Sequence, residues 1–405
     1  MPEEVSTAER QHAEESIAAP SISRAYLCQC GRPVFLRNSR CLACSTPLGF
    51  VVERLGVMPL APIESDDAQE EFTVFGEPQG PRLRRCGNFD SAIGCNWMRP
   101  ASADADEAEG LLPGLCLACS TTRTIPDLSV PENPGRWNLL EQAKRRLMSQ
   151  LLALGLPVRT RIADPVHGLA FDLLSDQAQQ RVMTGHSEGV ITLNIAEAED
   201  AVREQVRAQM HEPYRTLLGH FRHEIGHYYW DVLVAPQADW LDGFRAVFGD
   251  ERADYGAALQ THYANGPRPD WVTHYVSSYA GSHPWEDWAE TWAHYLHMAD
   301  TVDTAISFGV NAARAEIGAD DLFHAEDLWQ PQHPDAASFL EFLNAWVRLT
   351  HVLNEFSRSM GQPDTYPFVL PHAVVPKLQF IHVLIADQRK GPAATQAPSA
   401  QVEGG

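Results

Sequence analysis

Four stretches of the chain carry apolar side chains at helical spacing. Residues 137–154, 216–230, 284–296 and 339–353 repeat apolar positions every three to four residues, which predicts amphipathic helices with one buried face. Residues 189–195 alternate apolar and polar side chains, which predicts a β-strand. The pattern predicts an α+β fold: a mostly helical domain with a small sheet.

The segments around these elements set the expected domain boundaries. Composition and cysteine spacing predict two small β modules and a helical domain, separated by polar stretches. We expect an acidic loop within the second module, at 102–110. The expected order is a disordered tail at 1–20, a first module at 21–60, a linker at 61–80, a second module at 81–130, the helical domain at 131–389 and a flexible tail at 390–405.

All eight cysteines lie before residue 120 and divide into two groups of four. The fragment Cys116-Leu-Ala-Cys119 repeats Cys41-Leu-Ala-Cys44, which indicates two related zinc ribbons. Four thiolates brought together by short turns can hold one zinc ion, so we expect one or two structural zinc ions. The first group is Cys28, Cys30, Cys41 and Cys44, and the second is Cys86, Cys95, Cys116 and Cys119.

Disulfide bonds are the alternative for an even number of cysteines. The Cys-x-x-Cys spacing and the absence of a recognisable secretion signal favour metal binding in a reducing compartment. A disulfide framework therefore remains the second interpretation of this region.

The predicted helix at 216–230 contains the motif His223-Glu224-Ile225-Gly226-His227. Two imidazoles four residues apart project from one face of a helix and can bind a single zinc ion. Glu224 is then placed to take a proton from a zinc-bound water. The spacing predicts a catalytic zinc site, which needs a third protein ligand and one open position.

Two downstream segments offer that third ligand. In the Trp-rich stretch at 284–296, Glu286 and Glu290 share a helix face, so one can bind zinc while the other accepts the free ring N–H of a ligating histidine. In residues 249–255, also helical in pattern, Asp250, Glu251 or Asp254 could bind the metal instead, and Glu251 is the main alternative. We prefer Glu286, and we expect Asp231, four residues after His227, to orient an imidazole.

These motifs resemble those of the gluzincin metallopeptidases. Residues 279–290 are similar to the corresponding segment of the lethal-factor type of protease. The resemblance implies that Glu286 is the zinc ligand, that Glu290 supports a ligating histidine, and that Tyr279 stabilises the oxyanion. His283 and His294 are the alternatives for that last role. Over 25–385, the chain resembles bacterial zinc-binding metallopeptidases with an N-terminal zinc ribbon, a likeness that implies no substrate.

Composition limits the partners. The net charge of −22 argues against a sequence-independent grip on nucleic acid, although Arg24, Arg32, Arg37 and Arg40 make the first ribbon locally basic. The first 20 residues contain no apolar run, and no stretch of about 18 apolar residues occurs, so we expect neither a signal peptide nor a membrane span. We expect a cytoplasmic protein with a peptide or protein substrate, and the ribbons offer a surface for a protein partner.

The motifs predict a zinc metallopeptidase that hydrolyses peptide bonds with a zinc-bound water activated by Glu224. The alternative function is a binding or regulatory protein in which the ribbons carry the role and the His-Glu-x-x-His helix holds zinc without turnover. Glu224 favours the enzyme, since a binding protein has no need of that base.

Overall fold

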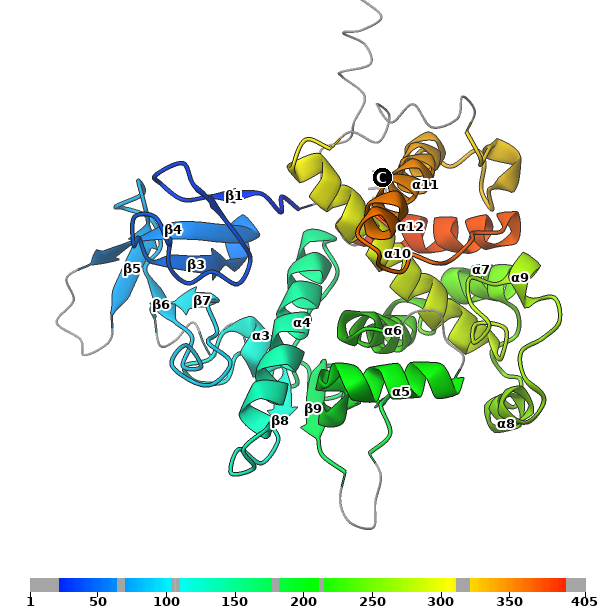
Figure 1. Ribbon diagram of the computed structural model, residues 1–405, viewed down its shortest axis with the longest axis horizontal. Helices are drawn as coiled ribbons and strands as arrows, with labels where there is room; N and C mark the ends of the chain where they lie inside the picture. The colour runs from blue at the N-terminus through cyan, green and yellow to red at the C-terminus, as the bar shows by residue number, and fades with distance from the viewer. Residues whose placement is uncertain are drawn as a thin grey trace, which may run out of the picture.

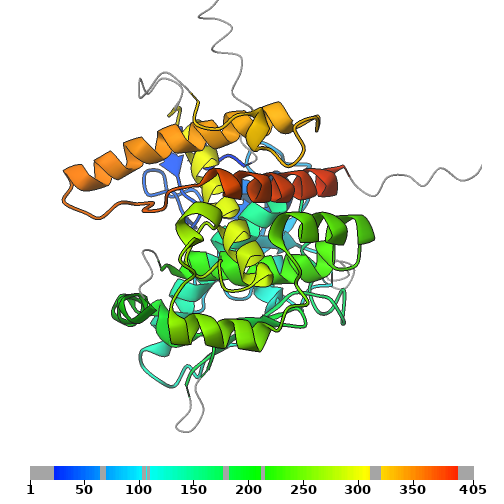
Figure 2. The same ribbon diagram turned by 90° about the vertical axis from the view of Figure 1, so that its right-hand side faces the viewer.

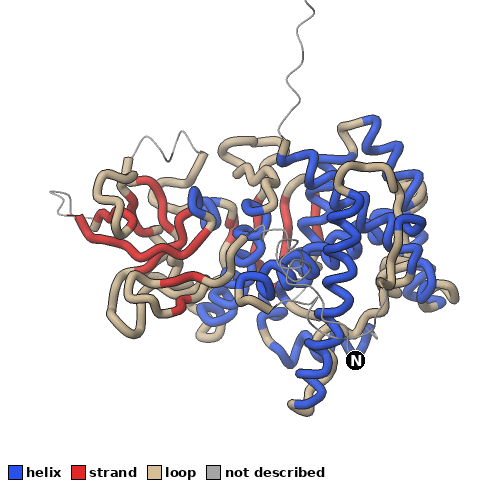
Figure 3. Tube along the Cα trace, turned by 90° about the horizontal axis from the view of Figure 1, so that it is seen from above, coloured by secondary structure: helices blue, strands red, loops and turns tan. Residues whose placement is uncertain are grey.

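The computed structural model describes residues 22–63, 70–102, 106, 110–176, 182–210, 215–310 and 321–390. The predicted tail at 1–20, nearly all of the predicted tail at 390–405 and most of the predicted loop at 102–110 lie outside these residues. Short strands gather at the N-terminal end of the molecule, and helices form the larger body beside them (Figures 1 and 3). This arrangement confirms the predicted α+β class with small cysteine-bearing β modules in front.

The N-terminal part contains a two-stranded hairpin and a five-stranded antiparallel sheet with strands in the order β3-β4-β5-β6-β7. The sheet adjoins both cysteine groups: β3 follows Cys44 in the chain, and Cys86 and Cys95 lie between β6 and β7. The stretch 61–80, expected as a linker, contains the end of β4 and all of β5, which are paired strands. The strands are β1 (Tyr26–Leu27), β2 (Pro33–Val34), β3 (Leu48–Val51), β4 (Gly56–Ile63), β5 (Glu71–Val74), β6 (Leu83–Arg85) and β7 (Met98–Pro100).

A second sheet of four strands, in the order β10-β11-β9-β8, belongs to the helical body. The strand predicted at 189–195 is β11 (Val190–Asn194), which pairs in parallel with β9 (Ala170–Leu174) and antiparallel with β10 (Gly185–Ser187). The strand β8 (Thr122–Thr124) begins three residues after Cys119 and pairs with β9. The second cysteine group is therefore tied to the body through a shared sheet.

All four predicted helices are present, and six further α-helices accompany them among the described residues. The helices predicted around 137, 216, 284 and 339 are α4, α6, α10 and α11, and Figure 2 shows α11 and α12 along one side of the body. The bounds are α3 (Leu117–Ser120), α4 (Asn133–Ala153), α5 (Asp200–Met210), α6 (Leu217–Tyr229), α7 (Ala238–Phe248), α8 (Tyr255–Asn265), α9 (Trp271–His274), α10 (Pro284–Ser307), α11 (Ala336–Ser359) and α12 (Val375–Arg389).

None of the helices within the described ranges combines the length and the apolar character that crossing a membrane would require.

The close packing of α6 against α10 sets the distance between the two predicted ligand helices. A Cβ atom at Gly226 would lie 3.2 Å from Ala289 Cα and 3.2 Å from Trp292 Cβ, so a side chain there would push the helices apart. The indole of Trp288 donates a hydrogen bond to the Gly226 carbonyl at 2.8 Å. Glycine inside the His-Glu-x-x-His motif is thus explained by helix packing.

A buried cluster of charges connects the N-terminal segment to this helix pair. The carboxylate of Asp300 on α10 accepts hydrogen bonds from Arg24 Nε (2.9 Å), Arg146 Nε (2.7 Å) and Arg222 Nη2 (2.8 Å). Burial raises the pKa of Asp300, but the three guanidinium charges outweigh it, so that the pKa lies well below its ordinary value. One carboxylate therefore pairs with arginines from the segment before β1, from α4 and from α6.

We expect Asp300→Asn to lower the free energy of unfolding by about 3–5 kcal/mol, because two buried guanidinium groups (Arg24 and Arg222) and a partly exposed one (Arg146) would lose their counter-charge. Denaturant unfolding measures the loss, and Asp270→Asn, which removes an exposed partner of Arg268, should change little. Because the folded-state pKa of Asp300 is depressed, its contribution is present at neutral pH and is lost as the pH falls below about 4. The difference between wild type and Asp300→Asn should therefore shrink in acid, and a constant difference would contradict the assignment.

Candidate metal centre

The helix α6 presents both motif histidines on one face because its opposite face is buried. Thr216 begins the helix by accepting a hydrogen bond from the Gly219 amide at 3.0 Å. Phe221 and Ile225 are fully buried, as the apolar pattern predicts. His223 and His227 then lie one turn apart, with ring centroids separated by 5.0 Å.

The first turn of α10 brings Glu286 to these imidazoles. His283 caps the helix by accepting a hydrogen bond from the Trp285 amide at 3.1 Å, and Pro284 follows at the first helical position. Glu286 is 1% exposed. Its Oε2 lies 3.1 Å from His223 Nε2 and 3.6 Å from His227 Nε2.

The chemistry of this group fits a zinc ion. Ligand atoms about 2.0–2.1 Å from a tetrahedral zinc lie roughly 3.3 Å from one another, close to the spacing of these three atoms. Glu286 Oε2 is buried and has no hydrogen-bond partner, which is costly for a carboxylate oxygen unless a cation shares the site. Two imidazole nitrogens and one carboxylate oxygen match the donor set of a catalytic zinc.

Glu290 lies behind His223, as expected for the residue that orients it. His223 Nδ1 lies 2.7 Å from Glu290 Oε1, and the Ser277 hydroxyl donates to Glu290 Oε2 at 2.6 Å. Burial raises the pKa of Glu290, but its hydrogen bond and charge interaction with His223 reverse the effect and lower the pKa to about 2. With its Nδ1–H held by Glu290, His223 directs Nε2 toward Glu286.

We expect Glu290→Ala to weaken zinc binding at this group by about 10- to 100-fold while the cysteine sites keep their metal. Competition with a chelator of known affinity measures the change. The matched control is Glu355→Ala, which removes an exposed carboxylate that pairs with Arg358. An unchanged affinity in Glu290→Ala would show that Glu290 does not support the site.

Glu224 is buried next to the same group. It is 8% exposed, and burial raises its pKa. The charges of His223 and His227 lower this pKa, whereas that of Glu286 raises it, so all three predicted ligands are near enough to act on the carboxyl. The structure therefore places a buried carboxyl beside the three atoms that fit a metal.

The alternative ligand Glu251 and the expected supporting residue Asp231 make other contacts. Glu251 pairs with Arg245, with Oε2 3.0 Å from Nε, and is not among the residues grouped with the imidazoles. Asp231 Oδ2 lies 3.8 Å from His186 Nδ1, while His227 Nδ1 is buried without a hydrogen-bond partner. Asp231 therefore does not orient His227 in this structure, because the ring nitrogen that would donate to it has no hydrogen-bond partner.

The three candidates for oxyanion stabilisation differ in their surroundings. The ring of Tyr279 lies 6.0 Å from that of His223. His283 Nε2 lies 3.1 Å from the Ala253 carbonyl, and His294 Nδ1 lies 2.6 Å from the Tyr366 hydroxyl. Tyr279 is the candidate whose ring approaches a predicted ligand directly.

Several residues at the centre carry no motif in the sequence. Tyr255 donates a hydrogen bond to Glu286 Oε1 at 2.6 Å, and the ring of Trp285 lies 4.0 Å from that of His227. His186, from β10, stacks on His227 at 6.5 Å. Trp285 adjoins Glu286 in the chain and could have been suspected, whereas Tyr255, His186 and Ser277 reach the site only through the tertiary fold.

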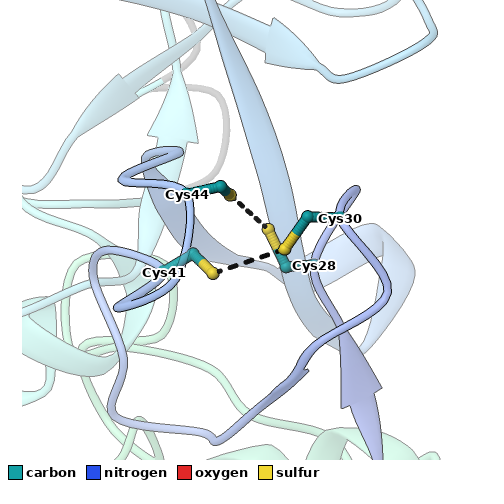
Figure 4. A group of neighbouring side chains, drawn as sticks. All are labelled: Cys28, Cys30, Cys41 and Cys44. Atoms are coloured by element: carbon teal, nitrogen blue, oxygen red, sulfur yellow. Dashed lines mark hydrogen bonds between the residues drawn. The ribbon is translucent and has the colours of Figure 1, made fainter.

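The cysteines form two compact groups, as their spacing predicts. In the first group, Sγ atoms lie 3.5 Å apart for Cys28 and Cys44 and 3.8 Å apart for Cys30 and Cys41 (Figure 4). In the second group, Cys95 and Cys116 are 3.7 Å apart. Sulfur atoms about 2.3 Å from a tetrahedral zinc lie roughly 3.8 Å from one another.

All eight cysteines are free thiols, which favours the metal interpretation over the disulfide framework. A hydrogen bond with Thr46 lowers the pKa of Cys44 to about 6, which favours the thiolate that binds metal.

A His-x-x-x-His helix joined to a buried carboxylate, behind two four-cysteine groups, defines a zinc-binding protein. The chain belongs to the family described as "putative zinc-binding metallo-peptidase", whose pattern matches residues 133–384. Residues 25–130 match a zinc-ribbon domain. These matches confirm the resemblance to zinc-binding metallopeptidases with an N-terminal ribbon.

Relatives occur in mycobacteria. Uncharacterized proteins of two Mycobacterium tuberculosis strains and of Mycobacterium bovis are each 42% identical to this chain over 356 residues, which cover 88% of this chain and 93% of each relative. No solved structure matches the chain.

Proposed function

We propose that the protein is a zinc-dependent peptidase with one catalytic zinc, held by His223, His227 and Glu286, and two structural zinc ions in the cysteine groups. The observation that carries the proposal is the convergence of two imidazoles and one carboxylate on a single point, with Glu224 buried beside it. Three protein ligands leave one position of a tetrahedral zinc for water, which is the arrangement of catalytic zinc sites.

A zinc ion in this position would lower the pKa of a coordinated water to about 7 and polarise the carbonyl of the substrate. Glu224 would accept the proton released from that water and deliver it to the leaving amine. Burial raises the pKa of Glu224 above its ordinary value, and a raised pKa favours a carboxyl that must both take and return a proton. Tyr279 would donate a hydrogen bond to the developing oxyanion.

The edge of the four-stranded sheet offers a place for an extended peptide. β10 is an outer strand of that sheet, and it lies beside α6. A peptide can add to such an edge through main-chain hydrogen bonds, which would bring its backbone alongside the metal helix. This arrangement supports a peptide or protein as substrate.

Cleavage-site profiling tests the proposal. Protein loaded with zinc at all three sites should cleave members of a diverse peptide library, as identified by mass spectrometry. A chelator that removes only the weakest-held zinc should abolish cleavage, and added zinc should restore it. Fully loaded protein that cleaves neither peptides nor unfolded proteins would contradict the proposal and favour the ribbon-based binding protein.

A further inference from the structure

The helix α8 (Tyr255–Asn265) covers the metal centre without being anchored in the core. None of its residues is buried. It approaches the centre through two side chains on the same face: Tyr255 reaches Glu286, and the ring of His262 lies 5.7 Å from the ring of Tyr279. A helix held by a few polar and aromatic contacts, with no buried apolar face, belongs to the least stable part of a fold.

Glycines mark both ends of the segment that carries α8. Gly249 ends α7 with φ 106° and ψ −174°, and Gly266 ends α8 with φ 79° and ψ −177°. This region of backbone space is accessible to glycine and strained for other residues. A Cβ atom at Gly266 would meet no heavy atom within 4 Å, so the glycine there is required by backbone conformation and not by crowding. Such positions absorb the backbone rotations of hinged segments.

The contact between Tyr255 and Glu286 separates the roles of the two carboxylate oxygens. Oε2 faces the imidazole nitrogens at 3.1 and 3.6 Å, whereas Oε1 accepts the hydrogen bond from the Tyr255 hydroxyl at 2.6 Å. The phenol ring is set by neighbouring rings, with His283 at 5.2 Å and Trp285 at 5.8 Å. With Oε1 occupied, Glu286 offers a metal one oxygen.

We propose that Tyr255 is a positioning residue that restricts Glu286 to binding zinc through one oxygen, and that α8, hinged at Gly249 and Gly266, is a movable cover latched by this contact. The inference rests on the metal centre proposed above, to which it adds the positioning role of Tyr255 and the movement of α8. A carboxylate that binds through both oxygens adds a further ligand to a zinc that also holds water, and this changes its geometry from tetrahedral. Loss of the hydrogen bond between Tyr255 and Glu286 would therefore change the metal coordination as well as the mobility of α8.

The test compares Tyr255→Phe with wild type. The matched control is Tyr275→Phe. Tyr275 also lies in the stretch between α7 and α10, and its hydroxyl accepts a hydrogen bond from Arg268 outside the centre. Each protein is stripped of its weakest-held zinc and titrated with Co²⁺, and its visible spectrum and Co²⁺ affinity are measured. Amide hydrogen exchange of 255–265 is followed in the same samples.

We expect Tyr255→Phe to bind Co²⁺ about 10- to 100-fold more weakly, with shifted d–d bands. Exchange in 255–265 should accelerate while exchange in α6 stays slow, and Tyr275→Phe should match wild type. If wild type binds Co²⁺ and Tyr255→Phe has the same spectrum, Co²⁺ affinity and exchange rates, the inference is overturned while the proposed function stands. Wild type that binds no Co²⁺ at this centre would overturn the proposed function, and the inference with it.

Discussion

Replacement of Glu224 by glutamine is expected to lower peptide hydrolysis by about 10²- to 10⁴-fold while all three zinc ions are retained. The amide has nearly the size of the carboxyl and fits the same buried position, where the side chain is 8% exposed. It cannot accept a proton, so the step assigned to Glu224 is lost. The measurement is the cleavage rate of the best library peptide, with zinc content determined on the same preparation.

The matched control for this variant is Glu77→Gln, which alters an exposed carboxylate that pairs with Arg54 in the ribbon region. Its rate should equal that of wild type. Near-normal hydrolysis by Glu224→Gln would remove Glu224 from the mechanism, and loss of zinc from it would mean that the residue supports the metal.

Replacement of Glu286 by alanine is expected to reduce the zinc content from three ions to two. The carboxylate oxygen that lies between the two imidazoles is removed, and two histidines alone make an incomplete site. The loss of affinity should exceed the roughly 10- to 100-fold expected when an outer partner such as Glu290 is removed. Elemental analysis after dialysis gives the zinc content.

The control is Glu251→Ala, the other ligand considered from the sequence, which should keep three zinc ions because Glu251 pairs with Arg245. Circular dichroism would establish that both variants are folded. The opposite result, with zinc kept in Glu286→Ala and lost in Glu251→Ala, would move the third ligand to 249–255.

Local periodicity was sufficient to predict the elements that build the centre. The helix predicted at 216–230 is α6 (Leu217–Tyr229), and the Trp-rich helix that carries Glu286 is α10. Both have a strongly buried apolar face, with Trp288 and Trp292 fully buried, so the pattern of side chains reflects the core directly. The position of Glu286 relative to the histidines then follows from the packing of α6 on α10 at Gly226.

Local pattern was misleading where short polar interactions compete with the helix. Residues 249–255 resemble a helix in sequence, but the structure has a turn there, in which the Arg252 guanidinium donates to Asp250. Asp254 instead caps α8 by accepting from the Ala257 amide at 2.9 Å. Side-chain hydrogen bonds of this kind favour turns and helix ends over helix interiors.

Residues that reach the centre from distant parts of the chain could not be predicted at all. Tyr255 is the first residue of α8, Ser277 lies in a connecting segment, and His186 is on an outer strand. Their contacts depend on how those segments fold back over α10, and the periodicity of apolar residues does not predict this tertiary arrangement. The pairing of β4 with β5 could not be predicted either, because the polar residues within 61–80 are typical of a linker.

The central claim is that His223, His227 and Glu286 hold one zinc ion that keeps a position for water. Diffraction from crystals of the zinc-loaded protein, recorded on both sides of the zinc absorption edge, tests it most directly, since the cysteine sites supply internal references. We predict an anomalous peak about 2.0–2.2 Å from both imidazole Nε2 atoms and from Glu286 Oε2, with a water as fourth ligand. Peaks in the two cysteine groups with no peak between these three residues would contradict the account.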